Sequence, residues 1–263
     1  MQRLSGLDAS FLYLETPSQH LHVCSILELD TSTMTGGYPF DRLRDALSLR
    51  LKAMPQFREK LADSPLNLDH PVWVDDNNFD VNRHLHRIGL PPPGGRTELS
   101  EICGHIASLP LDRSRPLWEM WVIEGIAGTN AHEDGRLAVM TKVHHASVDG
   151  VTGANLMSQL CSTEADAPAP DPVNGVGDAN QIQIAASGLV RFASRPLHLA
   201  NVLPTTVSSV VKTLARARTG STMARPFAAP PTVFNASVTA HRNIAYAQLD
   251  LEDVKKVKNH FNV

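Results

Sequence analysis

The chain has 263 residues, and 24 Lys and Arg against 27 Asp and Glu give a formal net charge of −3. Apolar residues at 42% and charged residues at 19% are typical of a globular protein and exclude a disordered chain. The charge provides no basic field for nucleic acid. Three widely spaced cysteines without a C-x-x-C pair indicate free thiols in a reducing compartment. The N-terminal segment lacks the apolar core of a signal peptide, and no apolar run is long enough to cross a membrane, so we expect a cytoplasmic protein.

The first part of the chain alternates between strand and helix patterns. Apolar and β-branched runs predict strands at 22–30, 70–76, 79–95, 117–128 and 135–145, the third of them ending in a Pro-Gly loop. Helical spacing of apolar residues predicts helices at 40–55, 96–110 and 150–162. In the first of these helices we expect Asp41 to cap the start and Pro55 to end it.

The composition changes after Thr163. Residues 163–178 are rich in Pro, Ala, Gly and Asp and predict a surface linker. No acidic residue lies between Asp178 and Asp250, whereas seven Lys and Arg do. Two helical segments are expected there, at 184–203 and 206–220, and then a strand that runs into a charged helix over 242–261. The predicted division is therefore a domain at 1–163, a linker at 164–182, and a basic helical crossover with the beginning of a second domain at 183–263.

The stretch "KVHHASVDGVTG", residues 142–153, contains the strongest candidate for chemistry. Side chains alternate between faces along a strand, so His144 and His145 should point to opposite sides. They cannot easily share one metal ion, and no further Cys, Asp or Glu stands at ligand spacing, so a metal site is not expected. The pairs at 20 and 22 and at 84 and 86 share faces but lack a third ligand, and we interpret them as surface or packing residues.

Beyond His145 the pattern is strand, tight turn and helix, with Asp149 and Gly150 in the turn. A histidine at such a strand end can act as a general base, because the unperturbed pKa of imidazole is about 6.5. The alternative is a satisfied histidine pair followed by an ordinary turn, and the residues alone leave both readings open. Ser147 and Cys161 are weak candidates for a nucleophile, since one lacks a G-x-S-x-G elbow and the other lacks a basic neighbour.

The segment "HHASVDG" resembles the H-H-x-x-x-D-G signature of the CoA-dependent acyltransferase superfamily, which includes chloramphenicol acetyltransferase-like enzymes and condensation domains. The opening "RLSGLDASFLYLETPSQHLHV" is similar to that of bacterial wax ester synthase/diacylglycerol acyltransferases. "LPPPGG", "LPLDRSRPLWEMWVIEG" and the histidine motif follow in that family's order, and "FNASVTAHRNIAYAQLDLEDVKKV" resembles the segment that opens its second half. The resemblance runs along the whole chain, and mycobacterial triacylglycerol synthases are the nearest type.

This resemblance implies an α/β fold, a chloramphenicol acetyltransferase-like half with a mixed sheet flanked by helices, followed by a helical linker and the start of a second half. It implies that His145 is the general base, which takes the hydroxyl proton of an acyl acceptor without a covalent enzyme intermediate. His144 would be a supporting residue, Asp149 a structural residue paired with Arg113 or Arg115, and Gly150 a point of close backbone approach. No bound cofactor is implied, and acyl-CoA is the co-substrate. No residue can be assigned to it.

Members of this family are nearly twice as long as this chain, so the resemblance implies an N-terminal half. The expected function is transfer of a long-chain acyl group from acyl-CoA to diacylglycerol or a fatty alcohol, with a complementing C-terminal chain as a partner. Two alternatives remain: a catalytically silent half that binds lipid or a complementing chain, and acyl transfer from a carrier protein. The acid-free basic window is compatible with an anionic membrane or lipid-inclusion surface, with CoA phosphates, or with a solvated linker.

Overall fold

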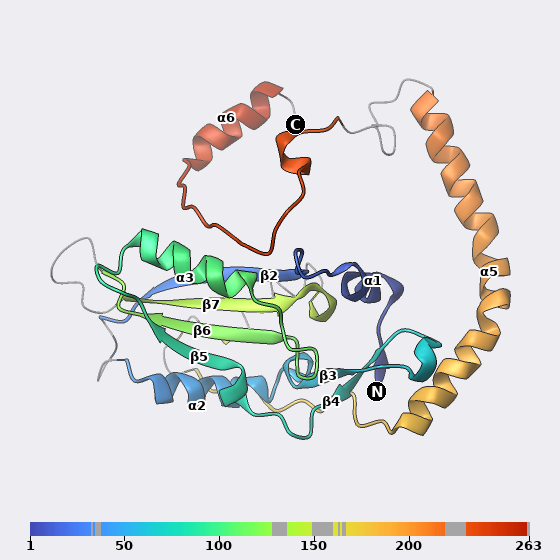
Figure 1. The fold of residues 1–263 in the computed structure, drawn as a ribbon, viewed down its shortest axis with the longest axis horizontal. Coiled ribbons are helices and arrows are strands. Elements are labelled where there is room, and N and C mark those ends of the chain that lie inside the picture. The colour runs from blue at the N-terminus through green and yellow to red at the C-terminus, as the bar shows by residue number, and fades with distance from the viewer. Residues whose placement is uncertain are drawn as a thin grey trace.

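The computed structural model describes residues 1–32, 34, 38–127, 136–148, 160–162, 164, 167–218 and 230–261. In this part of the chain, helices pack on a central sheet, a small second sheet lies beside it, and one long helix runs along the edge of the molecule (Figure 1). The C-terminal segment passes over the central sheet on the side of α3 (Figure 1).

The central sheet has four strands in the spatial order β2, β7, β6, β5. They span His22–Asp30, Arg136–His144, Trp118–Glu124 and Leu85–Gly89. β7 is antiparallel to β2 and β6, while β5 is parallel to β6, so the sheet is mixed. Every residue of β7 except the first is buried. The end of β7 that carries His144 is therefore part of the protein core.

Two helices cover the two faces of this sheet, α2 at Phe40–Leu51 and α3 at Arg96–Ser108 (Figure 1). The alternation along β7 divides the core between them. Leu137, Val139 and Val143 pack in the cluster that contains Leu47 and Leu51 of α2, and Ala138 and Met140 pack in the cluster that contains Leu99, Cys103 and Ile106 of α3. The predicted alternation of faces is thus confirmed along this strand.

A smaller sheet has the order β1, β4, β3, formed by Gln2–Arg3, Val72–Asp75 and Glu59–Ala62. Helix α1, Gly6–Leu14, follows soon after β1. Ser5 caps its N-terminus, because the Ser5 side chain accepts the Asp8 N–H. The buried face of α1, formed by Ala9 and Leu12, packs in one cluster with Leu117 and Ala146. Leu117 lies just before β6, and Ala146 lies just after β7. This packing holds α1 against the end of β7.

Residues 167–180 are irregular but attached to the body of the protein. The Val173 N–H donates to the carbonyl of Lys52, the Val176 N–H to Glu59, and the Gly177 N–H to Asp75. Two of these acceptors belong to β3 and β4, so the segment follows the small sheet toward the long helix. The division of the chain at residues 163 and 182 stays a prediction.

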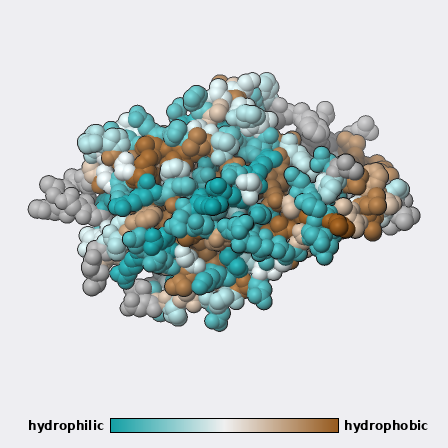
Figure 2. All heavy atoms as spheres, turned by 60° about the horizontal axis from the view of Figure 1, so that its bottom comes forward, coloured by the Kyte–Doolittle hydropathy of each residue, from teal (hydrophilic) through white to brown (hydrophobic). Residues whose placement is uncertain are grey.

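The two predicted helical segments lie on one helix, α5, which spans Gln181–Arg218 and contains Pro196 and Pro204. Its first turns are anchored: Ile184 packs on Val72 and Val74, and Arg191 pairs with Asp69 at 3.2 Å. Further along, large apolar side chains are half exposed, namely Leu203, Val207, Val210, Val211 and Leu214. Figure 2 shows apolar atoms gathered at the right-hand edge, where α5 lies in Figure 1.

The strand predicted at the start of 242–261 is wrong, whereas the charged helix is confirmed as α6, Leu251–Phe261. Residues 242–250 are irregular because their backbone crosses helix α3 and does not join a sheet edge. A Cβ at Gly104 would collide with the carbonyl of Arg242, and the guanidinium of Arg96 lies 4.8 Å from the ring centre of Tyr246. Alternating apolar residues here serve packing on a helix.

Two details of α2 also differ from the prediction. Asp41 does not cap α2, because the helix begins at Phe40 and places Asp41 inside the first turn, where it pairs with Arg44 at 2.8 Å. The helix ends at Leu51, ahead of Pro55. The helix predicted over 150–162 lies outside the described residues except for its last three.

Candidate active site

The histidine motif lies where β7 leaves the sheet. β7 ends at His144, and His145–Ser147 form a short 3-10 turn. The His144 N–H donates to the carbonyl of Leu117, and the His145 N–H donates to the carbonyl of Leu21, at 3.0 and 2.9 Å. Both histidine backbones are therefore fixed between the segments that precede β6 and β2. Because the strand stops one residue earlier than predicted, the turn sets the direction of the His145 side chain.

His144 is buried, with 1% of its surface exposed. Its Nδ1 accepts the Ala146 N–H at 3.0 Å, so the proton of the neutral ring is on Nε2. Nε2 lies 3.5 Å from Oε2 of Glu15. Burial disfavours the charged imidazolium and lowers the pKa of His144 to about 4, although the Glu15 carboxylate acts in the opposite direction. His144 is thus neutral near pH 7, and one of its nitrogens is committed to the turn.

His145 is more accessible than its neighbour and is only partly buried. Its ring stacks on Phe11 of α1, with ring centres 5.0 Å apart and planes inclined by 22°. Phe11 therefore holds the His145 ring, and the Leu21 carbonyl holds the His145 backbone. A partly exposed imidazole held in one orientation can accept a proton from a bound hydroxyl group.

Asp149 and Gly150, the other two predicted site residues, lie outside the described residues. The two arginines considered as partners of Asp149 have other partners. Arg113 donates to Oε2 of Glu15 at 2.5 Å, and Arg115 lies 3.4 Å from Asp112. Sequence reasoning named these arginines but missed the acidic residues that they contact.

Sequence reasoning also missed a buried ion pair beside the motif. Lys142 has no exposed surface, and its Nζ lies 2.9 Å from Oε2 of Glu119 on β6. The same ammonium donates to the carbonyls of Ile106 and Leu109, at the C-terminal end of α3. A cation is favoured at a helix C-terminus, where carbonyls lack helical partners. A lysine in the middle of an apolar strand pattern is the signal that could have revealed it.

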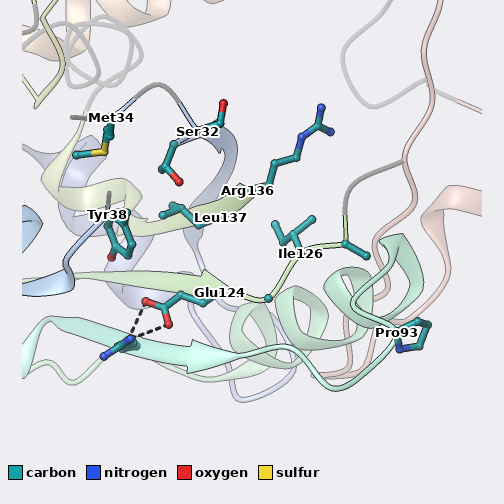
Figure 3. A pocket seen from close by; sticks show the side chains of 12 residues that line it. Ser32, Met34, Tyr38, Pro93, Glu124, Ile126, Arg136 and Leu137 are labelled. Atoms are coloured by element: carbon teal, nitrogen blue, oxygen red, sulfur yellow. Dashed lines mark hydrogen bonds and ion pairs between the residues drawn. The ribbon is translucent and has the colours of Figure 1, made fainter. Parts of the chain in front are cut away.

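A cavity lies at the end of the sheet opposite the histidine turn. About 720 Å³ in volume, it is lined by the ends of β2, β5, β6 and β7 and the residues next to them, among them Tyr38, Glu124 and Arg136 (Figure 3). Eight residue steps of β7 separate Arg136 from His144, roughly 26 Å at the usual strand rise. Arg87 and Glu124 form an ion pair at this end, with Nε of Arg87 2.8 Å from Oε1 of Glu124. The cavity and the histidine turn are two separate regions.

Within the described part of the chain, no three His, Cys, Asp or Glu side chains are grouped closely enough to hold a metal ion. The paired histidines outside the motif take part in ring packing. His20 stacks on His22, and His84 stacks on Trp118. Nor does any helix in these residues combine the length and hydropathy of a membrane span.

Comparison with known proteins identifies the family and the fold of the chain. The model of the wax ester synthase/diacylglycerol acyltransferase catalytic domain matches residues 4–263, and the chain belongs to this family. A solved structure from Marinobacter aquaeolei VT8, described as a wax ester synthase/diacylglycerol acyltransferase, superposes with a TM-score of 0.63 at 26% identity. The match covers 99% of this chain and 56% of that one. The fold is therefore the α/β fold of this family, with its mixed sheet flanked by helices.

Two similar proteins come from Mycobacterium tuberculosis, strain CDC 1551, and their names propose diacylglycerol O-acyltransferase activity. One is 65% identical over 263 residues, which are all of this chain but 51% of that protein. The other, tgs3, is 31% identical over 280 residues, 99% of this chain and 96% of that protein. The chain thus spans about half the length of the first relative and nearly the full length of the second.

Proposed function

We propose that the chain carries the catalytic histidine of an O-acyltransferase that moves a long-chain fatty acyl group from acyl-CoA to a lipid alcohol. Diacylglycerol is the favoured acceptor, which gives triacylglycerol, and a fatty alcohol would give a wax ester. The names of the relatives support this choice of acceptor. The observation that carries the proposal is the held, partly exposed His145 beside a neutral, buried His144 at the end of β7.

In this mechanism His145 takes the proton of the acceptor hydroxyl as its oxygen attacks the thioester carbonyl carbon. The C–S bond breaks as the new ester C–O bond forms, and the CoA thiolate receives the proton from the imidazolium. No covalent enzyme intermediate and no bound cofactor are required. General base catalysis of this kind is worth about 10²–10⁴-fold in rate.

The neighbouring residues have supporting roles in this proposal. His144 stabilises the turn, since its Nδ1 accepts the Ala146 N–H and its low pKa keeps it neutral. Asp149 is assigned a structural role, and Gly150 a role in close approach of the backbone to the substrate. Transient attachment to a membrane or lipid inclusion from the cytoplasm would bring the lipid acceptor to the enzyme.

The proposal is tested by incubating the purified chain with radiolabelled palmitoyl-CoA and either diacylglycerol or hexadecanol. The assay is run with the chain alone and with the C-terminal half of the 65% identical relative added as a separate polypeptide. Labelled triacylglycerol or wax ester that disappears in His145→Ala supports the proposal. Equal product from the variant would contradict the base assignment.

A second proposed function is a catalytically silent chain that binds lipid or a complementing chain. It would be supported by lipid binding without turnover in both forms of the assay. Replacing palmitoyl-CoA with palmitoyl carrier protein separates the third alternative, because a carrier-dependent enzyme would use only that donor.

A further inference from the structure

Glu15, the first residue after helix α1, is the acidic group closest to the histidine turn among the described residues. Its side chain is largely buried, with 11% exposed, and it contacts groups from three other parts of the chain. Oε2 accepts from Arg113 at 2.5 Å and lies 3.5 Å from Nε2 of His144, and Oε1 accepts the Leu21 N–H at 3.3 Å.

The contacts of Glu15 lead to His145 by two routes. The first runs through His144: Nε2 lies 3.5 Å from the carboxylate as a charge contact without a hydrogen bond, and Nδ1 on the other side of the ring accepts the Ala146 N–H within the turn. The second runs through Leu21, since Glu15 accepts its N–H while its carbonyl accepts the N–H of His145. One carboxylate thus holds the backbone on both sides of the His145 side chain.

Arg113 anchors this carboxylate. The same Nη2 that donates to Glu15 donates to the carbonyl of Leu12 at 2.8 Å, near the end of α1. Phe11, on the same helix, stacks on His145. Burial alone would raise the pKa of Glu15, but the Arg113 hydrogen bond and the charge interactions outweigh it, so that the pKa lies below its usual range. The carboxylate stays charged near neutral pH, as the pairing requires.

We propose that Glu15 is a positioning residue for His145, acting through His144 and Leu21 and held in place by Arg113. A carboxylate facing Nε2 favours the tautomer with the proton on that nitrogen, which leaves Nδ1 free to accept from the turn. Removing it loosens both backbone connections at once. The catalytic part of this assignment rests on the proposed function, whereas the structural part does not.

The test separates the two parts by using amide hydrogen exchange, which does not depend on turnover. Glu15→Ala should speed amide exchange at Leu21, His145 and Ala146 by about tenfold or more, because the carboxylate contacts that hold these segments in place are removed. Exchange at Met140, in the middle of β7, should stay as in the wild type. The matched control is Glu28→Ala, which removes an exposed carboxylate at the other end of β2 that lies 3.6 Å from Arg96.

Two comparisons sharpen the assignment. Glu15→Gln retains an oxygen for the Leu21 N–H but loses the charge that pairs with Arg113, so exchange at Leu21 should stay closer to the wild type than exchange at Ala146. Nitrogen-15 spectra of the histidine side chains should show the proton of His144 on Nε2 in the wild type and a mixture of tautomers in Glu15→Ala. Unchanged exchange and tautomer in Glu15→Ala, or a uniform rise that includes Met140, would overturn the positioning role.

In the acyl-transfer assay, Glu15→Ala should lower kcat by about 10- to 100-fold with little change in the KM for acyl-CoA, as a misplaced base does. Glu15→Gln should recover part of that loss. A large rise in KM with kcat retained would contradict positioning. Absence of turnover in the wild type would leave the exchange result standing and would count against the proposed function alone.

Discussion

The two ends of strand β6 hold two glutamates in different surroundings. Glu119, at the histidine end, pairs with Lys142, which has no exposed side-chain surface. Glu124, at the cavity end, pairs with Arg87, whose side chain is 57% exposed. The Lys142 side chain at one end of the sheet is fully buried, whereas the Arg87 side chain at the other end is exposed to solvent. The proposed base therefore lies at the end with the buried lysine, and the cavity of about 720 Å³ lies at the end with the exposed arginine.

The largest effect is expected on activity at the histidine end. His145→Ala should lower acyl transfer by about 10²–10⁴-fold, since it removes the proposed base. Arg87→Ala, at the cavity end, should leave the rate unchanged. Steady-state assays of the two variants check this, and a comparable loss in Arg87→Ala would remove the distinction between the two ends.

A stability comparison comes next. Glu119→Ala should lower the free energy of unfolding by about 3 kcal/mol, because it leaves Lys142 buried without its carboxylate. Glu124→Ala should cause no measurable change. Urea unfolding at pH 7.5 gives both values. Equal effects would mean that the two pairs do not differ in burial as the structure has them.

The pH dependence of stability should reveal the buried His144. Its pKa is lowered from the usual 6.5 to about 4, so the unfolded chain binds protons more readily in the interval between these values. The contribution of His144 to the free energy of unfolding is therefore fully present above pH 6.5. It is lost as the pH decreases toward 4, and the full loss is about 3 kcal/mol. His22, whose pKa is also lowered to about 4, acts in the same direction.

The matched variant for this prediction is His144→Asn, which keeps an acceptor for the Ala146 N–H but does not titrate. Its free energy of unfolding should change less between pH 7.5 and pH 5 than that of the wild type. Identical slopes for the two proteins would show that His144 is not the neutral, buried group described above.

The smallest effect concerns the thiols. Burial raises the pKa of Cys24 and Cys103 to about 11, whereas Cys161 is exposed. A disulfide reagent at pH 8 should modify one thiol per folded chain and three in urea. Rapid modification of Cys103 would indicate that α3 does not pack on the sheet as described.

Local patterns predicted the central fold well. β2 has the predicted bounds, and the alternation along β7 divides the core as expected, because β7 lies between two covered faces. The strand expected in residues 242–250 was wrong because alternation cannot tell a sheet edge from a path across a helix. The family and its fold followed from motif order, and comparison with known proteins confirmed them.

The environment of the candidate site was harder to predict. The histidines were evident from the motif, but Glu15 and Arg113 are 98 residues apart in the sequence and meet only in the folded chain. Nothing in the local pattern around Glu15 indicates that it faces His144. The roles of His145, His144, Asp149 and Gly150 stay predictions, since they depend on bound substrate.

The central claim is that chemistry takes place at the histidine end of the sheet. It is tested most directly by titrating an unreactive thioether analogue of palmitoyl-CoA into the form of the protein that shows turnover, while side-chain NMR signals are followed. We expect shifts for His145 and Phe11 and none for Tyr38, which lines the distant cavity. Shifts at Tyr38 with His145 and Phe11 unchanged would contradict it.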